Sequence, residues 1–531
     1  MPTPRPRVTG RRAVLFAVLL GLAAALLGSA PAQAFSLIPG ENVTTESGVV
    51  QGVVSLDHRE FRGIPFAAPP VGNRRFAAPQ PAASWKGERS ARSFGPACPQ
   101  AVPFLGIRYP TSSEDCLYLD VRTPPQAKSK NLPVMVWFYG GAYLLGSTDQ
   151  YDPTPLVTQG NVIVVSVSYR VGPFGFLSVP GGTANAGLLD QQAGLRWVQR
   201  NIAAFGGNPG NVTIFGESAG GNSVCQQLAS PTSAGLFHKA IVESGACGSS
   251  TLDGENLAAA QAKSADYAAS VGCPDAAAVL TCLRGRSVAQ LLASPSARFE
   301  SMTVGWRPVV DGVTETSGTG TAFAAGAQHQ VPVLIGGNHD EGRLFVALFH
   351  HLKGLGRVDR AGYEADVREV FGDRTDAILA RYADIASPDL ALGTVWTDGL
   401  FACSTSLAMQ SLARTAPAAY AYEFDDTDVP LQNLDPLMPL RSYHGSELFY
   451  LMDKALALPT PILNAKQKAL SRQMIGYWTT FARTGDPNGG GRPTWPQASS
   501  GNLLKLTTQG AGPAPSSLAA FAADHRCDAW T

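Results

Sequence analysis

Short runs of apolar, β-branched residues recur along the chain, separated by stretches with a helical pattern. Six such runs occupy residues 133–139, 162–169, 211–216, 240–244, 331–336 and 419–424. Each is hydrophobic almost throughout rather than at alternate positions, which is typical of strands covered on both faces. Together they predict an α/β fold with a mostly parallel, doubly wound sheet.

Helical periodicity appears between and after these runs. In residues 188–205 apolar side chains recur at spacings of three and four, and the same pattern returns near the end at Leu470, Met474, Trp478 and Phe481. This spacing predicts amphipathic helices that pack against the sheet. Residues 345–415 are also helical in character, and we expect them to form a cap over one side of the sheet.

Composition and charge exclude several classes of function. Of the 531 residues 45% are hydrophobic and 15% charged, which is enough to fill a large core and excludes a disordered chain. Lys and Arg together number 41, as do Asp and Glu, so the formal net charge is zero. Composition therefore gives no reason to expect a nucleic-acid or anionic-lipid partner.

The first 34 residues have the pattern of a signal peptide. A basic segment that includes Arg11 and Arg12 precedes an apolar stretch over residues 13–30, and an A-x-A sequence ends at Ala34. We predict cleavage after Ala34 and a secreted, extracellular protein, exported by the Sec or the twin-arginine route. The alternative is an uncleaved membrane anchor. No later apolar run is long enough to span a membrane.

The cysteines agree with export. All eight lie beyond the predicted leader, and an even number in an exported chain indicates disulfide bonds. The chain has no C-x-x-C and no H-E-x-x-H sequence, so we expect no metal site and no cofactor.

One serine lies in the sequence Gly216-Glu217-Ser218-Ala219-Gly220. It follows a predicted strand and precedes a predicted helix, the context in which G-x-S-x-G forms a nucleophile elbow. The glycines permit a tight turn that lifts the hydroxyl clear of the sheet. The alternative interpretation is a small residue in a tight turn. The strand and helix around it favour a nucleophile.

A serine nucleophile needs a histidine base and an acid that orients it. In α/β sheets of this kind the order along the chain is serine, acid, histidine. The strand at 331–336 leads into Asp340-Glu341-Gly342, which supplies the acid. His444 lies in a loop before Gly445 and is the candidate base. His339 is the main competitor for this role, but it is only two residues from Glu341, which disfavours a geometry in which the two side chains face each other.

An oxyanion hole needs backbone amides that a substrate can approach closely. The small residues Gly140, Gly141 and Ala142 follow the strand at 133–139 and offer such amides. Ala219, directly after the serine, supplies another. The alternative is a glycine-rich turn without function.

These segments together resemble the type-B carboxylesterase family of α/β-hydrolases, which includes the cholinesterases. The resemblance runs from about residue 43 to the end and is carried by FRGIPFAAPPVGNRRF, SEDCLYLDV, VMVWFYGGAY, FGESAGG, GGNHDEG, YHGSEL and WTTFARTGDPN. It implies one catalytic domain over residues 35–531. It also implies Ser218 as nucleophile, His444 as base and Glu341 as acid. The implied oxyanion-hole donors are the amides of Gly141, Ala142 and Ala219.

The same resemblance implies three disulfide bonds, Cys98–Cys116, Cys273–Cys282 and Cys403–Cys527. Cys225 and Cys247 remain, and their pairing is our own inference. The resemblance also implies a structural ion pair of Arg75 with Glu114, and buried supporting carboxylates at Glu217 and Glu447.

Departures from the family bear on the substrate, for which we expect a small-molecule or lipid ester. The loop between Cys98 and Cys116 lacks the tryptophan with which cholinesterases hold a quaternary ammonium, which argues against choline esters. Met302 and Val304 fall where the family has bulky acyl-pocket aromatics, and they predict a roomier pocket. A lipase or sterol esterase acting on long-chain esters is the alternative enzyme, and a non-catalytic binding protein is the alternative outside enzymes.

Overall fold

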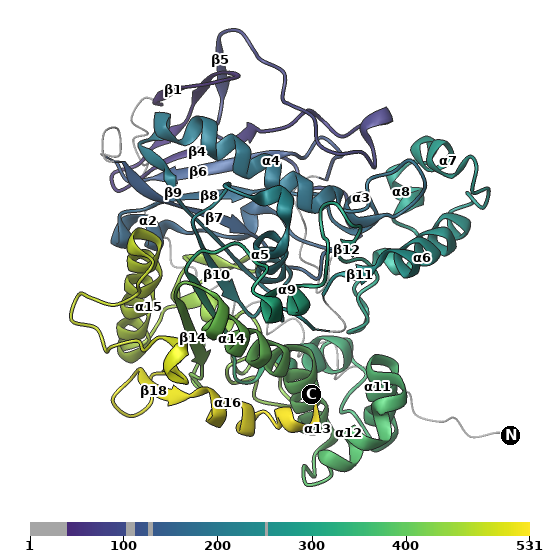
Figure 1. Cartoon of the computed structure of the whole chain (residues 1–531), viewed down its shortest axis with the longest axis vertical. Helices are drawn as coiled ribbons and strands as arrows, with labels where there is room; N and C mark the ends of the chain where they lie inside the picture. Colours follow the sequence, from purple (N-terminus) through teal and green to yellow (C-terminus); the bar gives the residue numbers. More distant parts are fainter. Residues whose placement is uncertain (1–39, 102–111, 126–130, 250–252, 531) are drawn as a thin grey trace, which may run out of the picture. The chain divides into compact units, whose positions relative to one another are not determined.

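A mixed sheet of eleven strands forms the centre of the protein (Figure 1). The structure is a computed structural model that describes residues 40–101, 112–125, 131–249 and 253–530. The leader predicted for residues 1–34 lies outside the described residues. Residues 40–531 form one compact unit.

The central strands of the sheet are the six predicted from their continuous hydrophobicity. In spatial order the sheet consists of β18 (Ala514–Ser517), β17 (Asn502–Leu506), β14 (Ala419–Phe424), β13 (Val333–Asn338), β10 (Lys239–Glu243), β9 (Gly207–Glu217), β7 (Leu132–Phe138), β8 (Ile163–Val167), β6 (Tyr118–Thr123), β4 (Arg59–Pro65) and β3 (Val53–Val54). All neighbours from β17 to β8 are parallel, and the pairings outside them are antiparallel.

Helices cover both faces of this sheet. On one face lie α4 (Ala186–Asn201), α5 (Ala219–Ala229) and α14 (Cys403–Thr415), and on the other lie α2 (Thr154–Gly160) and α15 (Ala465–Thr484). Strand β7 contributes side chains to both faces, because successive side chains of a strand point to opposite sides of the sheet. Val134 and Val136 belong to the apolar cluster that contains Leu195 of α4, whereas Met135 and Trp137 belong to the cluster around Trp478 of α15.

The helical segment expected to form a cap has an apolar cluster of its own. The cap segment contains the helices α10 (Glu341–Val346), α11 (Arg360–Phe371), α12 (Thr375–Arg381) and α13 (Pro388–Trp396). Phe345, Tyr363 and Trp396 are buried together there, with Met302 from a preceding loop. This cluster lies directly after β13, so the cap begins at the carboxyl end of a central strand.

The remaining α-helices and strands lie around the sheet, and all except α6 (Leu257–Ser270, 14 residues) are short. They are β1 (Asn42–Thr45), β2 (Gly48–Gln51), β5 (Glu88–Ser90), α3 (Gly172–Phe176), β11 (Glu255–Asn256), α6 (Leu257–Ser270), α7 (Val279–Gly285), α8 (Val288–Leu291), β12 (Val309–Val310), α9 (Thr319–Ala325), β15 (Lys454–Ala455), β16 (Leu458–Pro459) and α16 (Leu518–Asp524). Among the described residues, no helix is both long and apolar enough to cross a membrane.

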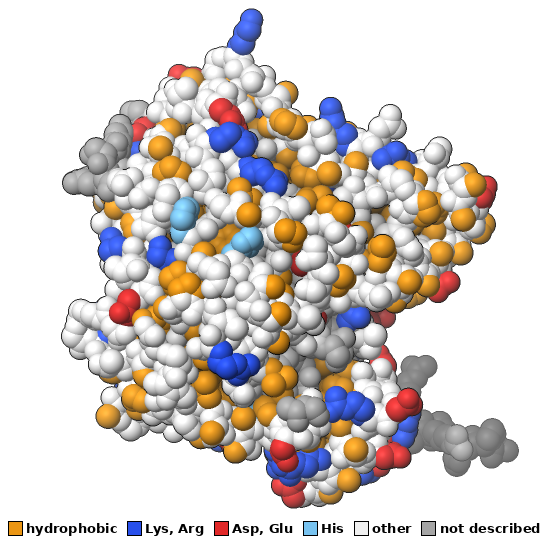
Figure 2. All heavy atoms as spheres, viewed as in Figure 1, with side chains coloured by type: hydrophobic (Ala, Val, Ile, Leu, Met, Phe, Trp, Pro, Cys, Tyr) orange, Lys and Arg blue, Asp and Glu red, His pale blue; other side chains and the backbone are white. Residues whose placement is uncertain are grey.

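Four disulfide bonds link the eight cysteines in the pairs Cys98–Cys116, Cys225–Cys247, Cys273–Cys282 and Cys403–Cys527. Arg75 and Glu114 form the expected ion pair, with nitrogen and oxygen 2.5 Å apart. Charged side chains of both signs are scattered over the face shown in Figure 2, in keeping with a net charge of zero.

Candidate active site

Ser218 lies in a strained turn between β9 and α5. Its φ of 58° and ψ of −125° place a non-glycine residue in a sparsely populated conformation. The neighbouring glycines make this turn possible, since a Cβ on Gly220 would lie 2.0 Å from the carbonyl oxygen of Phe138 and one on Gly216 would lie 2.6 Å from Gly220. The turn therefore has the backbone geometry of a nucleophile elbow.

Glu341 and His444 come from different loops and meet directly. Glu341 is the first residue of α10, and its Oε1 accepts a hydrogen bond from the backbone N–H of Asn338 at 2.7 Å. Its Oε2 lies 2.6 Å from Nδ1 of His444. The two loops are also joined through the backbone, because the N–H of Asp340 donates to the carbonyl of Ser442 at 3.0 Å. Both side chains are buried, so this pair is protected from water.

The other ring nitrogen of His444 faces the serine elbow. Its Nε2 lies 3.1 Å from Oε1 of Glu217, the residue before Ser218, but the two atoms are not aligned as a hydrogen bond. Nε2 is thus a buried nitrogen without a hydrogen-bond partner among the described residues. The rings of Phe345 and Phe401 pack on the imidazole, with centroids 5.0 and 4.8 Å away.

Three further buried carboxyl groups surround this pair. Burial raises the pKa of Glu217 well above its ordinary value, and the nearby charges of Glu341 and Glu243 add to the rise. The pKa of Glu447 is raised in the same way, first by burial and then by the charges of Glu217 and Glu341. Burial raises the pKa of Glu243 to about 8. These shifts disfavour a negative charge on all three carboxyl groups, which limits the negative charge beside His444.

The loop that contains Gly141 and Ala142 passes close to the elbow. A Cβ on Gly140 would lie 2.9 Å from the Cβ of Ser218, so the loop after β7 passes close to the serine. Gly141 and Ala142 follow with φ values of 116° and 54°. Ala219 begins α5, and its amide is one of the first four that have no acceptor within a helix.

An apolar cavity of about 190 Å³ opens beside this loop. Gly140 and Gly141 form part of its wall, and the rest is mainly aliphatic and aromatic: Leu145, Phe299, Leu344, Leu348, Leu431, Leu434, Phe449, Leu456 and Leu458. No charged residue lines this cavity in the part of the chain that the structure describes. Met302 and Val304 are not among its lining residues; Met302 lies instead in the apolar cluster of the cap.

Several features of the site had no clear signal in the sequence. The leucines that line the cavity come from several segments, among them α10 with Leu344 and β16 with Leu458, and no single sequence pattern connects all of these segments. The packing of Phe345 and Phe401 on His444 likewise depends on tertiary contacts. His339, the competing histidine, is directed away from the serine and approaches Asp340 and Asp524.

Comparison with known proteins agrees with this architecture. The sequence profile of the carboxylesterase family matches residues 39–530. The chain is 36% identical to human cocaine esterase, with 85% of each protein covered. It is also 36% identical to the para-nitrobenzyl esterase of Bacillus subtilis, with 84% of this chain and 90% of that enzyme covered. Human bile salt-activated lipase is 35% identical over 84% of this chain and 63% of its own length. The chain therefore belongs to the carboxylesterase family of α/β-hydrolases and is a carboxylic ester hydrolase.

Proposed function

We propose that the protein cleaves esters through a Ser218–His444–Glu341 triad and a covalent acyl-enzyme. The observation that carries the proposal is the position of His444. Its Nδ1 lies 2.6 Å from Glu341, while its Nε2 is buried beside the serine elbow with no hydrogen-bond partner among the described residues. A nitrogen placed in this way can accept the serine proton.

The reaction has two similar halves. His444 Nε2 accepts the proton of Ser218 as its oxygen attacks the ester carbonyl, and Glu341 holds Nδ1–H and stabilises the imidazolium. The amides of Gly141, Ala142 and Ala219 donate to the oxyanion. His444 then returns the proton to the departing alcohol. Water, deprotonated by the same nitrogen, releases the acid from the serine.

The cavity supports esters with a neutral, apolar acyl or alcohol part. Among the described residues its leucine-rich wall has no carboxylate that could attract a cationic substrate. Transfer of an alkyl chain into the cavity releases about 25 cal/mol for each Å² of apolar surface removed from water. Leu434 and Leu458 line the cavity and are 44% and 39% exposed. They extend the apolar surface toward solvent, which favours long-chain esters as a second substrate class.

A chain-length series of p-nitrophenyl esters tests the reaction and the substrate class together. We expect kcat/KM to rise from acetyl to butyryl and octanoyl esters, because longer chains fill more of the cavity. Ser218→Ala should reduce kcat by at least about 10³-fold for every ester while the circular dichroism spectrum is unchanged. An enzyme that cleaves acetyl esters and rejects butyryl and octanoyl esters would exclude this use of the cavity. A near-normal rate in the alanine variant would exclude the serine mechanism.

We also propose that the protein is secreted after removal of residues 1–34. The four disulfide bonds support an oxidising compartment. Mass spectrometry of protein recovered from the culture medium should find Phe35 as the first residue. Full-length protein retained in the cytoplasm with reduced cysteines would contradict export.

A further inference from the structure

A second cluster of ionisable side chains lies where the C-terminal segment meets the ends of β13 and β14. His339 follows β13, Glu423 is in β14, and His525 follows α16. One ligand atom from each of the three lies within 4.8 Å of the other two. We propose that His339, Glu423 and His525 bind a divalent cation of the zinc type, with Asp524 as a fourth ligand at the rim.

The donor atoms are already grouped at distances close to those a metal ion requires. Nε2 of His525 lies 3.1 Å from Oε1 of Glu423, and Nε2 of His339 lies 3.3 Å from Oδ2 of Asp524. Two ligands bound tetrahedrally at zinc distances are about 3.3 Å apart. The two pairs must move closer together for all four donors to share one ion, since the atoms of the three core ligands lie within 4.8 Å of one another.

Carboxylates also lie behind both imidazoles. Nδ1 of His525 is hydrogen-bonded to Oδ1 of Asp398 at 2.8 Å, whereas Nδ1 of His339 lies 3.3 Å from Oδ2 of Asp340 without a hydrogen bond between them. Metal-binding histidines commonly donate their second N–H to a carboxylate, which fixes the tautomer and orients the ring. This arrangement leaves Nε2 of each ring for the ion.

The charge around the cluster suits a cation. Four carboxylates face the two rings: Asp340, Asp398, Glu423 and Asp524. Positively charged side chains nearby include Lys505, 3.1 Å from Glu423, and Arg343, 2.8 Å from Asp340. The charges of Arg441 and Arg526 also act on Asp340 and Asp398. A metal ion bound between the rings would be attracted by the four carboxylates.

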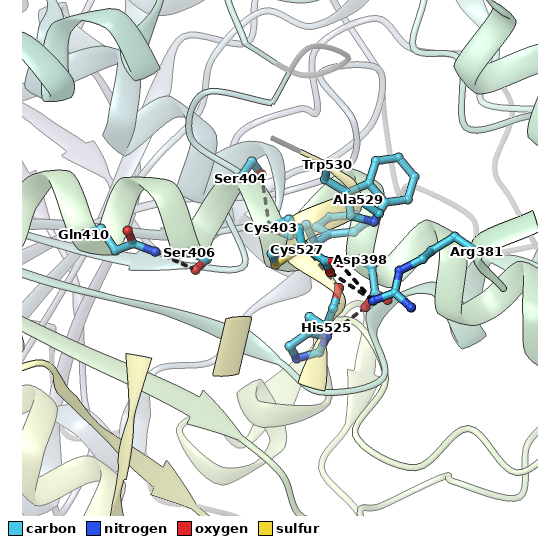
Figure 3. The surroundings of a disulfide bond; sticks show 12 residues. Arg381, Asp398, Cys403, Ser404, Ser406, Gln410, His525, Cys527, Ala529 and Trp530 are labelled. Carbon is cyan, nitrogen blue, oxygen red and sulfur yellow. Dashed lines mark hydrogen bonds and ion pairs between the residues drawn. A yellow bond between two sulfur atoms is a disulfide. The ribbon is translucent and has the colours of Figure 1, made fainter. Parts of the chain in front are cut away.

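The cluster is open to solvent on one side, and it lies beside a disulfide bond. Glu423 and His525 are buried, whereas Asp524 is exposed and opens the cluster to solvent. Figure 3 shows His525 and Asp398 beside the Cys403–Cys527 bridge. A bound ion would tie the same C-terminal segment to the sheet at a second point.

Thermal unfolding with added zinc tests the site. Protein first dialysed against EDTA is transferred to chelator-free buffer at pH 8.5. Its melting temperature should rise by about 2–3 °C when free Zn²⁺ reaches one hundred times its Kd. Mg²⁺, which prefers oxygen ligands in an octahedral arrangement, should produce no such shift. Co²⁺ should give the visible absorption of a tetrahedral complex.

Three variants separate this site from general zinc binding. His339→Gln and Asp524→Asn alter the more exposed half of the cluster. Each should raise the zinc concentration needed to reach a given shift in melting temperature by at least tenfold. His350→Gln is the matched control, since His350 is another partly exposed histidine paired with a carboxylate, Asp366, at 2.7 Å. It should leave the shift unchanged. The absence of a shift in the wild-type protein, or an equal shift in His339→Gln, would overturn the proposal.

Discussion

His444 is held on three sides by groups with different chemistry. Glu341 fixes Nδ1, the carboxyl of Glu217 lies beside Nε2, and the rings of Phe345 and Phe401 pack on the imidazole. Burial and the charges of Glu341 and Glu243 raise the pKa of Glu217 well above its ordinary value, which disfavours a negative charge on that carboxyl. Glu341 is the carboxyl group that is hydrogen-bonded to the imidazole.

A single change at Glu341 tests this arrangement at the scale of one residue. Glu341→Gln preserves the shape of the side chain but stabilises the wrong histidine tautomer, so kcat for p-nitrophenyl butyrate should fall by about 10⁴-fold. Glu364→Gln is the control, because Glu364 is a surface carboxylate paired with Arg360. It should retain the wild-type rate. Equal rates for the two variants would show that Glu341 does not orient His444.

At the scale of elements, the strands that are buried on both faces were predicted most accurately from the sequence. The six continuous apolar runs became the six central strands, because burial on both faces leaves few polar positions in them. Strands at the edge were not predicted: Val53–Val54 is too short to give a pattern, and Arg59–Pro65 contains charged residues. The elbow could be predicted because its glycines, serine and flanking elements are contiguous. The cavity could not, because its leucines meet only after folding.

The close packing at the elbow makes a second prediction. In Gly220→Ala the new methyl group would lie 2.0 Å from the carbonyl oxygen of Phe138, which forces β7 and α5 apart. We expect loss of esterase activity and a decrease of at least about 2 kcal/mol in the free energy of unfolding, measured in urea. Gly285→Ala is the control, because a methyl group there meets no atom within 4 Å. A fully active, stable Gly220→Ala protein would contradict the geometry.

At the scale of the whole molecule, the C-terminal segment is attached to the domain by charge as well as by a disulfide bond. His525 lies between Asp398 and Glu423, only two residues before Cys527. The resemblance to the family predicted the bridge between Cys403 and Cys527. The contacts of His525 were not predicted, because its partners Asp398 and Glu423 are more than one hundred residues away in the sequence.

This network should make stability depend on pH. The pKa of His525 is about 9 in the folded protein and 6.5 in a free histidine. Its protonated form therefore stabilises the fold fully below about pH 6.5, and this contribution is lost as the pH rises through 9. In EDTA, the free energy of unfolding should fall between pH 6.5 and 9 by on the order of 2 kcal/mol more in the wild type than in His525→Gln. Parallel pH profiles for the two proteins would contradict this role.

The central claim is that Ser218 carries the acyl group, and mapping a covalent adduct tests it most directly. After reaction with a fluorophosphonate, peptide mass spectrometry should place one adduct on Ser218. Labelling should slow by orders of magnitude in His444→Gln, because the serine then has no base. An adduct on another residue, or labelling of Ser218 at an unchanged rate without His444, would contradict the account.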